Sequence, residues 1–286
     1  MTGGKRMKKK RVIQKISSSI FAFLLTMIFV GLFALTGLYY GVFNNRIILS
    51  KVNESNYYNE VYEGLQEKAQ DIMEEAGIPL NVLTEVITLE RVYIGGKYYI
   101  EDALSGKEPV INSDKVRSQL EQNIDQYLTE EGISRTKELD DGIEEVVSKV
   151  EQEYKRGIHF QFINYIAEYK ASFMRLFRIA IPILVLLAGA ITVLLIKLHR
   201  YKHSGIRYIA YAMIASSCIV ISSSAFLLIT KNYERMKRLP DYYGRFLTNY
   251  LRWDIQVFMY LGGIGMLLAI LLIALVAYLK NNITSR

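Results

Sequence analysis

Residues 214–230 read IASSCIVISSSAFLLIT, an apolar stretch that contains five serines and one cysteine but no charged residue. With the apolar residues before it, this stretch is close to the roughly 20 residues that a helix needs to cross ~30 Å of hydrocarbon. Lipid offers no hydrogen-bond partner to a free backbone amide, so the segment is expected to be an α-helix. Its serines raise the question of whether they line a pore, catalyse a reaction or pack against another helix.

Three further stretches are also apolar and long enough to be candidate spans. They lie at about residues 16–43, 179–196 and 255–279. Like the stretch at 208–230, they contain no Asp, Glu, Lys or Arg. The chain is 51% hydrophobic and yet 22% charged, so the two populations must be segregated along it. The sequence therefore predicts an all-α polytopic membrane protein, with four transmembrane helices and a mainly α-helical outer domain inserted between the first and second spans.

The predicted organisation follows from these stretches. It consists of a basic cytoplasmic N-terminus (1–15), transmembrane helix 1 (16–43), an extracytoplasmic, mainly helical domain (44–173), transmembrane helix 2 (174–198), a basic cytoplasmic loop (199–206), transmembrane helix 3 (207–230), an outer loop (231–254), transmembrane helix 4 (255–279) and a cytoplasmic tail (280–286). The first span is longer than the apolar region of a signal peptide and lacks a small-residue cleavage site, so we expect an uncleaved anchor.

Lys and Arg flank the apolar stretches unequally. The N-terminus, the loop between the second and third spans, and the tail carry 13 Lys and Arg and no Asp or Glu, whereas residues 44–174 carry 14 Lys and Arg against 25 Asp and Glu. Cytoplasmic segments are enriched in Lys and Arg. We therefore expect a multi-pass protein of the cell membrane with both termini in the cytoplasm. The net charge of +7 reflects this bias, and it indicates contact with the lipid bilayer and not with nucleic acid.

The outer domain shows helical spacing of apolar residues. Ser55 is expected to cap a first helix, which Gly77 ends, and a second helix is expected over residues 113–131, with Gly132 just after it. Residues 91–104 fit either a helix or a hairpin that turns at a Gly-Gly pair, and we favour the helix. The domain has no cysteine, because the single cysteine of the chain lies in the third span, and this usage is typical of a bacterial surface protein.

From Thr136 onward, apolar residues recur at helical spacing into the second span. Gly142 and Gly157 are the weak points, and each costs only about 1 kcal/mol relative to alanine. The pattern predicts a continuous or singly kinked helix. Such a stalk could transmit movement between the outer domain and the membrane, or simply anchor the domain.

No catalytic, cofactor-binding or metal-binding residue is predicted, and we expect no enzyme. His199 and His203 have the spacing of a helical metal-ligand pair, but Arg200 and Lys202 adjoin them and no acidic residue follows in the loop. Motifs of nucleophilic, phosphate-binding and zinc-dependent enzymes are absent from the sequence. Ion-coupled transport usually leaves an ionisable residue within a span, and the four apolar stretches contain no Asp, Glu, Lys or Arg.

The serines of the third span are interpreted as a packing surface. Catalysis by serine needs a base, which this stretch lacks, whereas small side chains on one face let transmembrane helices approach closely. A hydroxyl-lined conduit is the alternative, and the surface can lie within one chain or between two. The predicted helix-packing seam comprises Ala212, Ser216, Ser223 and Thr230 on the third span and Gly262, Gly265 and Ala269 on the fourth.

The loop at 231–254 is basic where the outer domain is acidic. Between residues 231 and 252 it carries six Lys and Arg against two Asp and Glu, together with several aromatic residues. Both segments are predicted on one side of the membrane, so we expect the loop to dock on the domain, with binding to anionic lipid as the alternative. The residues predicted to dock are Arg235, Lys237, Arg238, Tyr242 and Tyr243.

These patterns favour a non-enzymatic membrane protein whose acidic, tyrosine-rich outer domain binds or senses a partner or ligand. The expected partners, besides the bilayer, are a membrane or extracellular protein or further copies of the chain. The predicted topology also resembles that of the MacB/FtsX class of ABC-transporter membrane subunits. In both, one span is followed by a large outer domain and then by three further spans. That resemblance, which no sequence motif accompanies, implies a transporter subunit, and a channel subunit has an equivalent layout.

Overall fold

A computed structural model describes residues 2–199, 201–234 and 241–284, without the side chains of residues 2–11, 161, 232, 241, 242 and 282–284. The regular structure of these ranges is entirely helical. The elements are α1 (Thr2–Tyr40), α2 (Asn45–Glu54), α3 (Tyr57–Ala76), η1 (Leu80–Leu83), α4 (Leu89–Leu104), α5 (Asp114–Glu130), α6 (Lys137–Ile158), α7 (Gln161–Leu198), α8 (Lys202–Thr230), η2 (Asn232–Glu234) and α9 (Asp241–Thr284).

The chain forms two compact units. The first, here called the helix bundle, comprises Met1–Asn44, Phe173–Lys237 and Thr248–Arg286. The second, here called the helical domain, comprises Asn45–Ser172 and Arg238–Leu247. Both α7 and α9 contribute residues to each unit.

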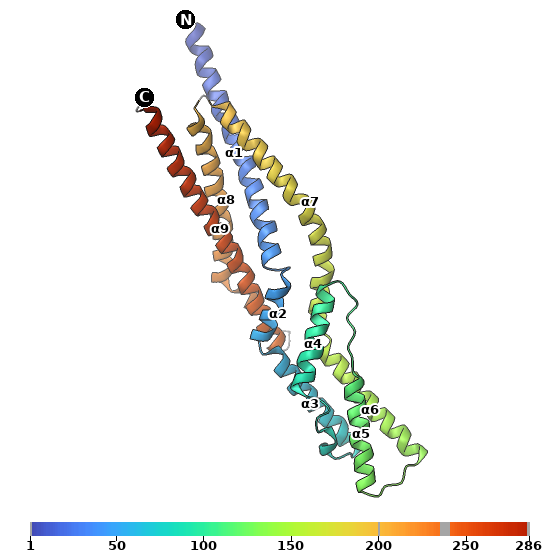
Figure 1. Ribbon diagram of the computed structural model, residues 1–286. Coiled ribbons are helices and arrows are strands. Elements are labelled where there is room, and N and C mark those ends of the chain that lie inside the picture. Colours follow the sequence, from blue (N-terminus) through green and yellow to red (C-terminus); the bar gives the residue numbers. More distant parts are fainter. Residues whose placement is uncertain (1, 200, 235–240, 285–286) are drawn as a thin grey trace. The chain divides into compact units, whose positions relative to one another are not determined.

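Four helices are long and apolar enough to cross a membrane, which confirms the predicted number of spans. They extend over Val12–Tyr40, Phe162–Leu198, Lys202–Thr230 and Tyr243–Asn281. Within the helix bundle the chain runs in one direction along α1 and α8 and in the opposite direction along α7 and α9 (Figure 1).

Within the helix bundle α1 packs extensively against α8. The Thr26 hydroxyl lies 2.9 Å from the Ala22 carbonyl oxygen of its own helix and 3.5 Å from the Ala212 carbonyl oxygen on α8. Leu25 and Leu195 are fully buried beside this contact. Small side chains therefore let the backbones of these two helices approach closely, as expected for helices that pack in lipid.

In the helical domain α3 packs against α2, α4 and α6. Its buried side chains recur every three or four residues, so they form one face of the helix. The helix ends as predicted at Gly77, which has φ +66°. The predicted cap is wrong: Asn56, with φ +60°, precedes the helix, and the Ser55 hydroxyl donates to the Val52 carbonyl instead.

Residues 91–104 lie within the helix α4, so the preferred helical prediction is confirmed. The Thr88 hydroxyl accepts a hydrogen bond from the backbone N–H of Arg91, which caps the helix. Gly96 does not turn the chain. It makes room for a ring of α3, because a Cβ atom at Gly96 would lie 2.7 Å from Cε1 of Tyr58.

The helix expected over 113–131 is α5, and Gly132 follows it with φ +66°. Polar contacts join α5 to α6. The Glu151 carboxylate accepts hydrogen bonds from the Ser113 hydroxyl at 2.8 Å and from the Arg117 guanidinium at 3.2 Å. Lys155, Ser113 and Arg117 lower the pKa of Glu151 to about 2.

The chain does not continue as one helix from Thr136 into the membrane. Helix α6 ends at Ile158, His159 is extended with ψ 109°, and α7 begins at Gln161. The break follows from side-chain packing, because Phe160 is fully buried against Tyr57, with ring centroids 4.8 Å apart. A continuous stalk is therefore wrong, and a break between two helices takes the place of the single kink that was the alternative.

Candidate functional site

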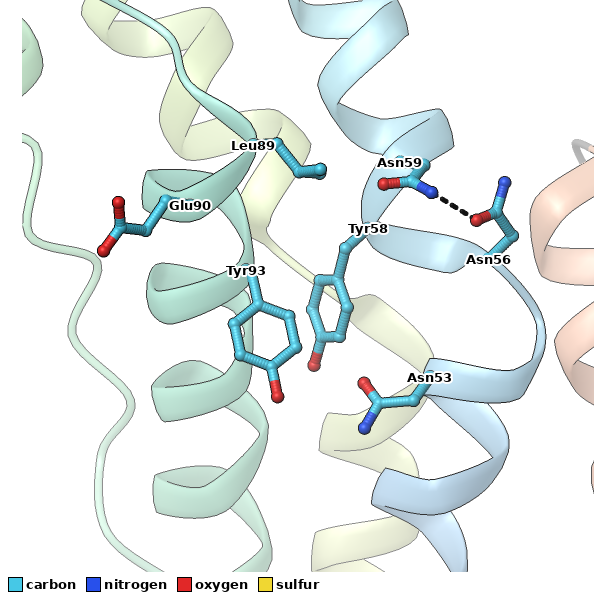
Figure 2. A pocket seen from close by; sticks show the side chains of 7 residues that line it. All are labelled: Asn53, Asn56, Tyr58, Asn59, Leu89, Glu90 and Tyr93. Carbon is cyan, nitrogen blue, oxygen red and sulfur yellow. Dashed lines mark hydrogen bonds between the residues drawn. The ribbon is translucent and has the colours of Figure 1, made fainter.

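A pocket of about 630 Å³ opens on the helical domain between α2, α3 and α4. Its lining is mostly aromatic and carboxamide. It consists of Asn53, Asn56, Tyr58, Asn59, Leu89, Glu90 and Tyr93. Figure 2 shows the three asparagines on the α2 and α3 side, the two tyrosine rings side by side, and the Glu90 carboxylate across α4 from the asparagines.

The asparagines are positioned by the turn between α2 and α3. Asn56 adopts a left-handed backbone conformation, which asparagine tolerates better than most residues. Its side-chain oxygen accepts a hydrogen bond from the Asn59 amide. That bond fixes two carboxamides on one wall, while Asn53 is exposed on the last turn of α2.

The aromatic wall is formed by Tyr58 and Tyr93, whose rings meet edge to face with centroids 5.0 Å apart. Tyr58 is only 6% exposed, whereas Tyr93 is 39% exposed. Burial raises the pKa of the Tyr58 phenol, and the neighbouring Tyr93 and Glu101 raise it further, so the phenol is neutral at physiological pH. Tyr58 thus forms a rigid floor, and Tyr93 presents its ring to solvent.

This arrangement suits recognition more than catalysis. Carboxamides donate and accept hydrogen bonds, tyrosine rings and Leu89 offer apolar area, and pockets with these features typically bind ligands. The pocket lining contains no cysteine, serine or histidine, and Glu90 is its one carboxylate. Within the part of the chain that the structure describes, no three His, Cys, Asp or Glu side chains are grouped to hold a metal ion.

The predicted seam residues fall into two sets. On α8, Ala212 and Ser216 are buried, whereas Ser223 is exposed and Thr230 is half-buried. On α9, Gly262, Gly265 and Ala269 are buried.

The structure also identifies what the buried set contacts. A Cβ atom at Gly265 would lie 2.4 Å from the Ser217 hydroxyl and 2.5 Å from the Phe33 ring. Ser217, and not Ser216 or Ser223, therefore faces the glycines of α9. Since α-helical periodicity places 216 and 217 on adjacent faces, sequence spacing alone did not distinguish them.

The predicted docking loop is only partly described. Arg235, Lys237 and Arg238 lie outside the described residues, as does the side chain of Tyr242. Tyr243 belongs to the helical domain, where its ring centroid lies 5.2 Å from that of Phe160 and 5.8 Å from that of Tyr57. The docking of the basic residues therefore stays a prediction.

Two contacts of this segment were not anticipated from the sequence. Phe246 is fully buried, with its ring centroid 5.4 Å from that of Phe160, and Arg245 forms an ion pair with Glu60. Spacing of Tyr243, Phe246, Leu247 and Tyr250 by three and four residues was the available signal for a helix here.

His199 and His203 do not share a helix, because α7 ends at Leu198 and α8 begins at Lys202. His199 Nδ1 lies 3.0 Å from the Leu195 carbonyl oxygen, while the His203 ring stacks on Tyr201. The apparent metal-ligand spacing is therefore interrupted by a turn.

Asp254 is a functional candidate that the sequence prediction missed. It was assigned to the loop at 231–254, but α9 already begins at Asp241, and the candidate span over 243–281 includes it. Asp254 is 4% exposed. An ionisable side chain in such a helix is uncommon and is often functional.

Comparisons of the chain with protein-family models, with curated proteins and with solved structures find no match of any of the three kinds. Functional inference therefore relies on the residues themselves.

Proposed function

We propose that this is a non-enzymatic integral membrane protein whose helical domain binds a partner through the pocket between α2, α3 and α4. The observation that carries the proposal is the combination of carboxamides on one wall with exposed Leu89 and Tyr93 on the other. An extended peptide segment of a protein partner fits this chemistry. Carboxamides can bond its backbone groups, and the apolar wall can cover one of its side chains.

The orientation belongs to the same proposal. The bias of Lys and Arg toward the termini and the loop before α8 supports cytoplasmic termini in a cell membrane, with the helical domain outside. In that orientation the pocket meets extracellular or membrane-protein partners. The backbone helix between the helical domain and the membrane is interrupted at His159, so a continuous helix does not convey binding at α3 and α4.

Site-specific photocrosslinking in intact cells tests the pocket. A photoreactive phenylalanine at Tyr93 is expected to form a defined adduct, whereas the same probe at Tyr98 is expected to form none. Tyr98 is the matched control because it is 61% exposed on the same helix but does not line the pocket. Mass spectrometry of the adduct should identify one recurrent peptide sequence. Equal adducts at both positions, or none at Tyr93, would contradict the proposal.

A second candidate function, a transporter or channel subunit, is favoured by one observation. The α8 face at Ser223 is exposed in the single chain although its hydroxyl would be unusual against lipid alone. A homo-oligomer that buries this face could enclose a conduit. Conductance in planar bilayers, compared between the wild type and Ser223→Ala, tests it. No current, or a current that the substitution leaves unchanged, counts against the conduit.

A further inference from the structure

The carboxylate of Asp254 is enclosed within the helix bundle. Asp254 lies on α9, one turn after Tyr250 and one turn before Phe258. Both of its carboxylate oxygens are buried, and neither has a hydrogen-bond partner among the residues that the structure describes. Buried polar groups in proteins almost always have partners, so this one requires an explanation.

A glycine in the turn after α1 makes room for this carboxylate, and a glycine of α1 makes room for the neighbouring Phe258 ring. A Cβ atom at Gly41 would lie 2.9 Å from Asp254 Oδ1 and 2.9 Å from the Gly37 carbonyl oxygen. A Cβ atom at Gly37 would lie 2.4 Å from the Phe258 ring. The carboxyl group therefore lies against the turn that follows α1, near the Gly37 carbonyl oxygen.

The charged and titratable neighbours that the structure describes do not neutralise it. Tyr250 faces it from the preceding turn, but its hydroxyl donates to the Val42 carbonyl oxygen. Arg252 points to another partner, with its guanidinium 3.5 Å from the Glu234 carboxylate. No ion pair of the described residues includes Asp254. The end of α1 contributes the Gly37 carbonyl oxygen, which carries partial negative charge.

If the Asp254 carboxylate were ionised, its negative charge would be buried beside the partial negative charge of a carbonyl oxygen. Burial of an unpaired charge is so costly that the group normally takes up a proton instead. A neutral carboxylic acid gains a donor, and its O–H can bond a carbonyl oxygen of the α1 terminus. A metal cation would need several oxygen ligands, and no group of three His, Cys, Asp or Glu among the described residues could hold one.

We propose that Asp254 is a proton-binding site of the helix bundle. The carboxyl holds its proton while α1 and α9 are packed at Gly41. When the two helices separate and water enters, the O–H bond breaks and the proton passes to water, leaving a hydrated carboxylate. The site therefore couples the packing of α1 against α9 to proton concentration, a coupling that the peptide pocket on the helical domain does not require.

Infrared difference spectroscopy of the protein in lipid nanodiscs tests this directly. In sodium- and potassium-free buffer at neutral pH, the wild type is expected to show the carbonyl band of a protonated carboxyl group. Asp254→Asn should lose that band completely, whereas Asp141→Asn should retain it, because Asp141 is exposed on α6. Tyr250→Phe should also retain it, since the Tyr250 hydroxyl bonds Val42.

Two results would overturn the proposal. One is a wild type that shows only ionised carboxylates at neutral pH. The other is a band that disappears at constant pH when sodium or potassium is added, which would identify a metal-cation site. If Asp254→Asn does not fold, wild-type protein labelled with ¹³C at its aspartate carboxyl carbons replaces it. Asp254 is the buried aspartate of the described residues, so a band that fails to shift on labelling equally refutes the assignment.

Discussion

The ring of Tyr58 lies directly against Gly96, and a Cβ atom on that glycine would approach Cε1 of the ring to 2.7 Å. Tyr58 is 6% exposed, so its ring has little space to move away. This contact sets the distance between α3 and α4 beneath the pocket floor.

Gly96→Ala is therefore expected to destabilise the helical domain by about 1–3 kcal/mol, the usual cost of overpacking. Hydrogen exchange of α3 and α4 amides in the detergent-solubilised protein measures it. Gly64→Ala is the control, because Gly64 lies on α3 with nothing within 4 Å of its Cβ position. That substitution should stabilise the helix by up to about 1 kcal/mol. Equal exchange in the two variants would show that Tyr58 can move aside.

Glu151 should make the contact between α5 and α6 sensitive to acid. Its pKa of about 2 lies below the ordinary value of 4.5, so its carboxylate stabilises the folded state above pH 4.5. This contribution is lost as the pH falls from 4.5 toward 2. Comparison of the wild type with Glu151→Gln by hydrogen exchange of α5 and α6 should show a difference at pH 6 that vanishes near pH 2. A difference that is constant with pH would assign the effect to packing.

The buried and exposed serines of α8 should respond differently to bulk. Ser216 is fully buried, so Ser216→Leu should overpack the helix bundle and cost about 1–3 kcal/mol, seen as a lower melting temperature in detergent. Ser223 is exposed, so Ser223→Leu should leave the melting temperature of a monomer unchanged. If Ser223→Leu instead reduces an oligomer to monomers on a sizing column, the exposed face is an interface between copies.

Arg245 and Glu60 should be weakly coupled. Their side chains are 54% and 21% exposed, and pairs this accessible to water contribute about 0.2–1 kcal/mol. A double-mutant cycle with Arg245→Gln and Glu60→Gln, measured by thermal unfolding, should give a coupling energy in this range that decreases as salt is raised. A coupling energy of zero at low salt would mean that the ring contacts of Tyr243 and Phe246 hold this segment without help from the ion pair.

Cysteine accessibility should define the orientation. On a Cys218→Ala background, cysteines at Ser105 and Tyr242 are expected to react with an impermeant reagent from outside intact cells, and those at Lys9 and Ser204 only after permeabilisation. The expectation follows from the 13 Lys and Arg that flank the spans on the predicted cytoplasmic side. Labelling of the Ser204 position from outside would reject the proposed topology.

The spans and several helix ends were predictable because their signals are local. An apolar run identifies a candidate span by itself, and Gly77 and Gly132 end their helices through their own backbone conformation. The start of α9 was not predictable in the same way, because Arg245, Arg252 and Asp254 interrupt its apolar pattern. In the folded protein Arg245 and Arg252 form ion pairs and Asp254 is buried. These contacts depend on tertiary packing, so they cannot be predicted from the composition of the segment.

The pocket could not be predicted, since it depends on contacts between distant residues. Asn53 and Tyr93 are brought together only when α2 and α3 pack on α4. Gly96, which makes room for Tyr58 of α3, belongs to a Gly-Gly pair that resembles a turn in the sequence. The break at His159 has a similar origin. Gly157 was recognised as a weak point, but it is the burial of Phe160 against Tyr57 that gives the interruption a structural reason.

The helical domain is discontinuous in the sequence, and this imposes an order on its biosynthesis. Residues 45–172 leave the ribosome well before Phe246, which covers Phe160 in the finished core. The rest of α7 and all of α8 are synthesised between these two parts of the domain. During that time the aromatic surface that Phe246 later covers is exposed. Contacts between residues this distant in sequence form slowly, and an exposed apolar surface in an incomplete domain invites aggregation. A chain that is truncated within α8 would therefore lack Phe246, and its helical domain would keep part of its aromatic core exposed to solvent.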